Sequence, residues 1–280
     1  VGRFTSPDLM TSLIKQQTID LIGAARPSIA DPYLPNKIKE GRIDEIRECI
    51  GCNICVSSDN LSVPIRCTQN PTMGEEWRRG WHPEKIKPRK TEQTALVVGA
   101  GPAGLECSMQ LARRGYHVIL SDGSSELGGR VLLESGLKGL SAWKRVVDNR
   151  VYEIQQKTNI EIYRESELTL SHINELGVNN LFIATGSNWR VDGIGRSQRK
   201  EITGLENIQV LTPTDAIKKQ SSLDGPIVIY DDDQGYLAGV IADHLSSLGH
   251  NVTFVTPASI VSPWTVSTLE QQRIQKSLLN

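Results

Sequence analysis

The sequence predicts an α/β protein in which the end of a (β/α)₈ barrel and a cysteine-rich segment precede Rossmann-like nucleotide-binding modules. Three observations predict this arrangement. An apolar strand runs directly into a glycine-rich turn at Leu96–Gly104, a second strand of the same kind starts at Ile227, and four cysteines cluster between Cys49 and Cys67. Strands that alternate with helical patterns of about 10–15 residues are typical of parallel sheets.

The composition argues against a nucleic-acid-binding protein and against a membrane protein. The 280 residues include 31 Lys and Arg against 32 Asp and Glu, which gives a net charge of −1. Nucleic-acid-binding modules are usually basic, so this balance argues against such a partner. No apolar run approaches the roughly 18 residues of a membrane span, and no secretion signal opens the chain. We therefore expect a cytoplasmic protein with neither a nucleic-acid nor a membrane partner.

Residues 1–47 alternate between strand-like and helical patterns. Leu9–Gln16 has helical apolar spacing, Ile19–Gly23 is predicted as a short buried strand, and Ile38–Ile46 is helical again. A barrel needs about 200 residues, so this segment cannot close one. Because the chain also begins with Val1 rather than methionine, we expect the segment to be the C-terminal end of a barrel whose earlier part is absent, rather than a small appendage.

Residues 48–92 hold the cysteines and end in a polar linker. The pattern is C-x₂-C-x₂-C-x₁₁-C, and Gly51 gives the loop freedom to turn its amides toward sulfur. Four thiolates match the ligand demand of a [4Fe–4S] cluster, whereas Cys₄ zinc sites more often come as two separated C-x₂-C pairs. We expect the cluster, with zinc as the alternative. The ligands would be Cys49, Cys52, Cys55 and Cys67. The fifth cysteine, Cys107, is predicted to be a small buried apolar residue.

Residues 93–222 are predicted to form a nucleotide-binding domain. The strand Leu96–Val98 leads into G-x-G-x-x-G, a helix over Leu105–Arg114 and a second strand over His117–Leu120. The three glycines permit a tight turn, approach of the pyrophosphate and close helix–strand packing, and the helix N-terminus attracts phosphate. Asp122 stands where a ribose-binding carboxylate belongs. The motif residues are Gly99, Gly101, Pro102, Ala103 and Gly104. The alternative is a Rossmann-like module that binds no nucleotide.

Two later segments, Leu127–Arg130 and Phe182–Gly186, complete a set typical of flavin-disulfide-reductase domains. Gly129 and Arg130 are therefore expected to join the nucleotide site. By themselves, the glycines of the first segment could equally be turn residues.

Residues 223–280 are predicted to form a second, degenerate module of the NAD(P)-binding type. After the strand Ile227–Tyr230 comes an acidic turn, Asp231–Asp233, where a working dinucleotide loop would have glycines. Three carboxylates would repel a pyrophosphate. We expect this module to keep the fold and to have lost NAD(P)H binding.

Several segments occur in a characteristic order: Ala25–Pro32, Cys49–Cys55, Cys67–Asn70, Arg79–Pro83 and then the glycine motif. Together they resemble the trimethylamine dehydrogenase family of iron–sulfur flavoproteins over the whole chain. Dimethylamine and histamine dehydrogenases and dimethylglycine-type demethylases belong to this group. The more distant 2,4-dienoyl-CoA reductases carry an extra residue between the second and third cysteines, so the spacing here favours the amine branch.

The resemblance implies an FMN-binding barrel at the N-terminus. Gly2 and Arg3 would end its seventh strand, and Ala25 and Arg26 would hold the FMN phosphate. From the residues alone, Arg26 would be a surface side chain that caps a loop. The middle domain would hold ADP, or the ADP part of FAD, through its glycines and Asp122. The substrate-pocket residues of the family fall outside this chain, so no residue is assigned as catalytic, and His82 in the linker is expected to be structural.

Three functions follow as hypotheses. The first is oxidative dealkylation of a secondary or tertiary N-methyl amine, with electrons passing from FMN through the cluster to an electron-transferring flavoprotein. The second is an NAD(P)H-dependent 2,4-dienoyl-CoA or enoate reductase, against which the acidic turn argues. The third is an electron-transfer module with no catalysis of its own. The resemblance also implies a homodimer for the complete protein.

Overall fold

The computed structural model describes residues 4–280, so the expected FMN contacts of Gly2 and Arg3 lie outside the described residues. The chain divides into two compact units. The first takes in the chain up to Gly186, apart from the short segments 60–62 and 136–141. These segments belong to the second unit together with residues 187–280. The division falls inside the segment 93–222 that was predicted as one domain.

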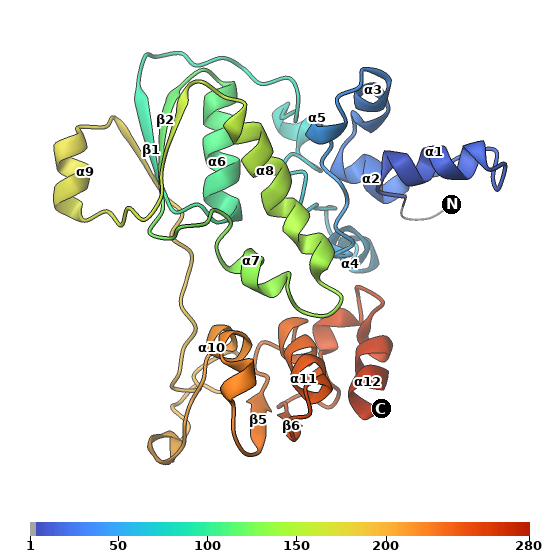
Figure 1. The fold of residues 1–280 in the computed structure, drawn as a ribbon, viewed down its shortest axis with the longest axis vertical. Helices are drawn as coiled ribbons and strands as arrows, with labels where there is room; N and C mark the ends of the chain where they lie inside the picture. Colours follow the sequence, from blue (N-terminus) through green and yellow to red (C-terminus); the bar gives the residue numbers. More distant parts are fainter. Residues whose placement is uncertain (1–3) are drawn as a thin grey trace. The chain divides into compact units, whose positions relative to one another are not determined.

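The first unit combines a helical N-terminal part with a parallel sheet (Figure 1). Its elements in chain order are α1 (Pro7–Lys15), α2 (Ala25–Ala30), α3 (Leu34–Lys39), α4 (Ile54–Asn60), α5 (Glu76–Arg79), β1 (Thr94–Val98), α6 (Pro102–Arg113), β2 (His117–Ser121), α7 (Arg130–Glu134), α8 (Arg145–Gln155), β3 (Ile160–Tyr163), α9 (Leu170–Leu176) and β4 (Asn180–Ile183).

The sheet has the strand order β3-β2-β1-β4, and every pair is parallel. Val97 of β1 is in register with Leu120 of β2 on one side and with Phe182 of β4 on the other. The chain therefore leaves β1 toward β2 and later returns to the opposite side of β1. In open α/β sheets, ligands bind at the carboxyl ends of the strands where this reversal occurs.

Helices α6 and α8 run alongside the sheet and enclose the core of the unit (Figure 1). Side chains from β1, β2 and both helices are buried together. They include Val97, Leu105, Met109, Leu120 and Ile154. Burial of this kind stabilises the fold by about 25 cal/mol per Å² of apolar surface removed from water. The strand β1 and helix α6 are thus held rigidly on either side of the glycine turn.

Strands β1 and β2 and helix α6 form where the sequence predicts them, with boundaries shifted by a few residues at most. Pro102 occupies the first turn of α6, where its missing N–H leaves no hydrogen bond unmade. Gly115 ends the helix with a φ of 92°. That left-handed conformation favours glycine and turns the chain back toward β2.

The second unit contains α10 (Pro213–Lys218), β5 (Ile227–Tyr230), α11 (Leu237–Ser247), β6 (Val252–Val255) and α12 (Gln271–Leu279). Strands β5 and β6 pair in parallel, with α11 as the connection between them. This is the predicted βαβ start of a second module. Its helix α11 buries Ile241, Ala242 and Leu245.

The structure corrects the expectation for Ile19–Gly23. This segment forms no strand, and its Leu21 side chain is 87% exposed. A strand satisfies its backbone groups only by pairing, and no strand among the described residues precedes Thr94. The predicted helix over Ile38–Ile46 is also wrong in extent: α3 ends at Lys39, and only a 3₁₀ turn over Ile43–Glu45 follows.

None of the helices within residues 4–280 combines the length and the apolar character needed to cross a bilayer.

Candidate functional site

The four clustered cysteines line one pocket of the first unit. Cys49 and Cys52 come from the loop that leads into α4, Cys55 is the second residue of α4, and Cys67 comes from the segment beyond that helix. Gly51 and Asn53, between the first three cysteines, both have a positive φ, of 72° and 56°. These left-handed residues curl the loop so that successive cysteines face the same space. The predicted ligand set is therefore brought together.

The surroundings of the sulfurs act on their protonation in opposite directions. Burial raises the pKa of the Cys55 and Cys67 thiols, and the neighbouring sulfurs of Cys49 and Cys52 raise it further. The backbone N–H groups of Asn70 and Gln69 lower the pKa of the Cys67 thiol, as donors near its sulfur do. Amides directed at sulfur, and four thiols around one pocket, fit the ligand demand of a [4Fe–4S] cluster.

Across residues 4–280, no three or more His, Cys, Asp or Glu side chains are arranged around a position for a single metal ion. The Cys52 sulfur lies 3.0 Å from the Thr68 hydroxyl oxygen.

Arg26 also lines the cysteine pocket. Its Nη1 donates a 2.6 Å hydrogen bond to Oδ1 of Asn53, within the cysteine loop. Ala25, at the start of the short helix α2, is exposed. The arginine expected to hold a flavin phosphate therefore lies beside the cysteines, which no pattern in the sequence indicates.

The glycine turn after β1 has the shape that a dinucleotide site requires. Gly99 has a φ of 101°, and a Cβ there would lie 2.4 Å from the carbonyl oxygen of Ala184. A Cβ on Gly104 would lie 1.8 Å from the carbonyl oxygen of Gly99. By contrast, no protein atom lies within 4 Å of a Cβ built on Gly101. Two glycines thus permit packing within the protein, and the middle one leaves open space for a ligand.

Asp122 and Gly129 lie next to this turn, and Arg130 follows Gly129 directly. The Asp122 carboxylate accepts hydrogen bonds from the backbone N–H of Ala100 (2.5 Å) and of Ser124 (2.8 Å). A Cβ on Gly129 would lie 3.2 Å from Cα of Gly101. Arg130 begins α7, where its Nε lies 2.7 Å from Oε1 of Glu134. Pro102 and Ala103 form the first turn of α6, whose leading N–H groups have no partner within the helix. The residues predicted from sequence for the nucleotide are therefore neighbours.

The corresponding turn of the second unit is filled by its own acidic side chains. Asp231, 2% exposed, accepts a 2.8 Å hydrogen bond at Oδ1 from the N–H of Gln234, while its Oδ2 has no partner. Burial, followed by the charges of Asp233 and Asp232, raises the pKa of Asp231. The Asp232 carboxylate binds the N–H of Ser197 at 2.9 and 3.0 Å.

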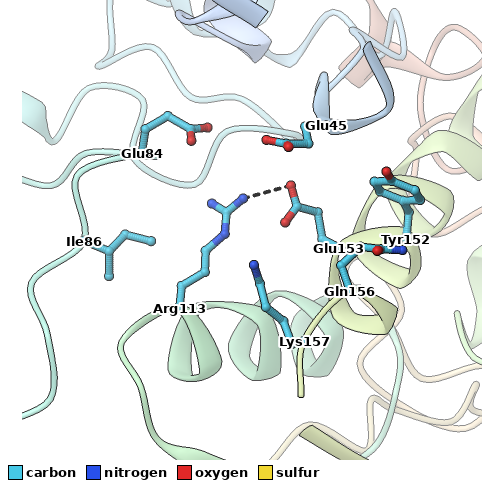
Figure 2. A pocket seen from close by; sticks show the side chains of 8 residues that line it. All are labelled: Glu45, Glu84, Ile86, Arg113, Tyr152, Glu153, Gln156 and Lys157. Atoms are coloured by element: carbon cyan, nitrogen blue, oxygen red, sulfur yellow. Dashed lines mark hydrogen bonds and ion pairs between the residues drawn. The ribbon is translucent and has the colours of Figure 1, made fainter. Parts of the chain in front are cut away.

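A cavity lies at the C-terminal end of α6, and Figure 2 shows its charged lining. Arg113 Nη2 and Glu153 Oε1 form a 2.9 Å ion pair across it, and Arg113 also donates to the carbonyl of Pro83. Residues at the C-terminal ends of α6 and α8 line the cavity, whereas the glycine turn lies at the N-terminal end of α6. Ligands of such sheets bind at the carboxyl ends of the strands, where the glycine turn lies, so we assign no site to this cavity.

Two residues weighed from the sequence have local partners. His82 accepts hydrogen bonds at Nδ1 from the N–H groups of Glu84 and Lys85, and its Nε2 contacts the Tyr33 hydroxyl. Both nitrogens therefore hold the linker in place. Cys107, predicted to be buried, packs against the hydrophobic core but is only partly buried, and that burial raises its pKa.

Sequence reasoning missed three charged residues next to the cysteine segment: Arg47, Glu106 and Arg150. The two arginines are each 3% exposed. Glu106 follows the third motif glycine by two positions, on a helix face that packs inward. The sequence signal that could have revealed Glu106 is a charged residue at a helix position that is expected to face inward.

Two family models match the sequence. The pyridine nucleotide-disulphide oxidoreductase model matches residues 93–278, and the NADH:flavin oxidoreductase / NADH oxidase model matches residues 1–45. The sequence is also similar to dimethylamine dehydrogenase of Hyphomicrobium sp., with 40% identity over 99% of this chain and 38% of that protein.

Solved structures agree. Histamine dehydrogenase from Rhizobium sp. 4-9 superposes with a TM-score of 0.96 at 49% identity, and 6-hydroxypseudooxynicotine amine oxidase from Pseudomonas geniculata N1 with 0.95 at 48%. Each match covers 99% of this chain, but only 41% and 42% of those proteins. The chain thus spans about two fifths of the length of these relatives.

Proposed function

Because the chain belongs to the trimethylamine dehydrogenase family of flavoproteins, we propose that the complete protein oxidises a secondary or tertiary N-methyl amine. Residues 93–278 also belong to the pyridine nucleotide-disulphide oxidoreductase family. The products would be an aldehyde and a dealkylated amine, and an electron-transferring flavoprotein would receive the electrons. We propose a homodimer for the complete protein.

The observation that carries the redox part of this proposal is the cysteine pocket. Cys49, Cys52, Cys55 and Cys67 would hold a [4Fe–4S] cluster, with the amides of Gln69 and Asn70 directed at sulfur. When bound, the cluster and a flavin supply one-electron and hydride chemistry that amino-acid side chains lack. The chain's own part is to hold the thiolates in one pocket and to shield them from solvent.

The glycine turn supports ADP, or the ADP part of FAD, in the first unit. Gly99 and Gly104 would allow the turn and its packing, while Gly101, Pro102 and Ala103 would present open space and helix amides to the pyrophosphate. Asp122 would bind the ribose. Gly129 and Arg130 would close the site from the α7 side, since Gly129 packs against Gly101.

We also propose that the N-terminal part of the chain contacts FMN. Gly2 and Arg3, together with Ala25 and Arg26, would belong to the barrel that holds the flavin. The hydrogen bond from Arg26 to Asn53 supports a short path between that flavin and the cysteine loop, because one side chain would border both.

The acidic turn of the second unit favours an amine dehydrogenase over an NAD(P)H-dependent reductase. The buried Asp231 side chain occupies the turn, and Asp232 binds the Ser197 N–H. A pyrophosphate entering there would meet negative charge rather than free amides.

The test uses the complete protein, purified without oxygen and shown to contain flavin and iron. Adding NADH or NADPH should leave the flavin absorbance unchanged, and one of a panel of N-methyl amines should bleach it. Rapid bleaching by NADH or NADPH would instead establish the reductase. If the purified protein contains no iron, the proposed [4Fe–4S] cluster is wrong.

A further inference from the structure

Two buried arginines share one carboxylate behind the cysteine pocket. Arg47 forms a forked pair with Glu106, at 2.9 Å from Nη1 and 3.0 Å from Nη2. Arg150 of α8 places Nε 2.7 Å from Oε2 of the same glutamate, close enough for an ion pair although not aligned as a hydrogen bond. With two positive charges and one negative, this Arg47–Glu106–Arg150 triad carries a net charge of +1.

Both arginines hold Gln69, which lies two residues after Cys67, the last of the four proposed ligands. Arg47 Nη1 donates to the Gln69 carbonyl at 2.7 Å. Arg150 donates to the Gln69 side-chain oxygen at 2.8 Å and to its carbonyl at 3.3 Å. Gln69 in turn directs its N–H at the Cys67 sulfur, and Arg150 lies near enough to Cys67 for their charges to interact.

Neighbouring charges are paired among themselves. Glu153 pairs with Arg113 at 2.9 Å, and Lys37 pairs with Asp31 at 2.8 Å and with Glu84 at 3.0 Å, so the first pair is balanced and the Lys37 group carries a net charge of −1. The two arginines of the triad, rather than these groups, hold Gln69. Gln69 is 1% exposed, so little water screens the space between the triad and Cys67. A charge in such a setting acts more strongly than it would at the surface.

We infer that the Arg47–Glu106–Arg150 triad sets the reduction potential of the cluster proposed at Cys67, raising it through its net positive charge and through the Gln69 peptide. The inference rests on the proposed cluster. Reduction adds one electron and therefore one negative charge to the cluster, and a nearby positive charge stabilises the reduced form. Arg47, Glu106 and Arg150 are positioning residues: they act on the cluster through Gln69 rather than through a cysteine sulfur.

The rival explanation is purely structural. The triad also joins the cysteine segment to α6 and α8, so any substitution could loosen the unit. A loosened pocket has no reason to respond to the sign of the charge removed. Two substitutions of opposite sign therefore separate the explanations.

The experiment titrates the complete protein with dithionite under argon and follows the reduced cluster by EPR. Arg150→Met should lower the midpoint potential and Glu106→Gln should raise it. We expect at least a tenfold change in the ratio of reduced to oxidised cluster at a fixed potential, equivalent to about 59 mV for one electron. Arg150→Lys keeps the charge and should stay near the wild-type value.

The double variant Arg113→Met/Glu153→Gln is the control, because it removes a mostly buried arginine together with its one carboxylate, and the carbonyl partner of Arg113 is Pro83 rather than Gln69. Its potential should equal that of the wild type. Iron content and the EPR line shape report separately whether the cluster is intact. Shifts of the same sign in both charge variants, or no shift with an intact cluster, would overturn the inference.

If Arg150→Met fails to fold, Glu106→Gln decides alone: an upward shift supports the inference, and no shift or a downward one refutes it. A wild-type protein without iron would refute the proposed cluster instead, which is a different result.

Discussion

Individual glycines of the nucleotide turn have different reasons to lack a side chain. Gly104 faces the backbone of Gly99 at a distance no Cβ tolerates, while Gly101 faces open space. The first requirement comes from the protein's own packing and the second from a ligand. One motif thus contains a stability determinant and a binding determinant three positions apart, and substitution can separate them.

Gly104→Ala should destabilise the first unit by about 3 kcal/mol or more, because the new methyl group overlaps a carbonyl that the strand cannot move. Gly101→Ala should leave the melting temperature almost unchanged, since the φ of −69° suits alanine. It should nevertheless weaken ADP binding at least tenfold, or about 1.4 kcal/mol. Calorimetry of melting and of ADP titration measures both. If Gly101→Ala binds ADP as tightly as the wild type does, the pyrophosphate does not bind at this turn.

Asp231 gives a second prediction at this scale. Burial raises its pKa above the ordinary value of 3.8, so the folded state binds more protons than the unfolded state as pH rises past that value. The contribution of the Asp231 carboxyl group to the stability of the folded state is therefore fully present below pH 3.8. It is lost as pH rises through the pKa that Asp231 has in the folded state. Asp231→Asn keeps the acceptor for the Gln234 N–H and removes the charge. It should stabilise the second unit by up to about 1 kcal/mol at neutral pH.

Urea unfolding at several pH values would show that gain shrinking toward acidic pH. Asp224→Asn, at an exposed carboxylate just before β5, is the control for exchanging a carboxylate for an amide. A constant gain for Asp231→Asn would contradict the raised pKa.

Among the elements, those defined by local sequence were predictable and those defined by partners were not. Strands β1, β2 and β5 are apolar runs bounded by glycine or polar turns, and the structure confirms them. The segment Ile19–Gly23 has a similar composition but no strand to pair with among the described residues. The short helix α2 contains Pro27, and a proline at that place gives no local signal for a helix.

The candidate site follows the same division. The four cysteines and the glycine turn are close in sequence, so spacing predicted both, and the structure brings each set together. The Arg47–Glu106–Arg150 triad joins three distant segments, and no pattern within any one of them reveals the contact. Prediction from one sequence fails where a site depends on tertiary packing alone.

Over the whole molecule, large apolar side chains are exposed on both units. In the first unit they include Leu21 at 87% and Trp77 at 85%, and in the second Leu269 at 75%. Isolated exposed apolar residues are normal, but many together favour association. We expect the 280-residue chain expressed alone to self-associate, with light scattering showing a mass well above 30.9 kDa. A monomer with a single cooperative melt would contradict this.

The return of β4 to the side of β1 has a consequence for how the protein is made. The tight fit of Gly99 against Ala184 joins positions far apart along the chain, and such contacts form late because a long loop must close first. A nascent chain that has emerged only as far as β3 would contain the whole glycine motif but not Ala184, against whose backbone Gly99 packs. Nucleotide capture should therefore mark the end of folding of this unit, and added ADP should slow its unfolding without hastening the first steps of its assembly.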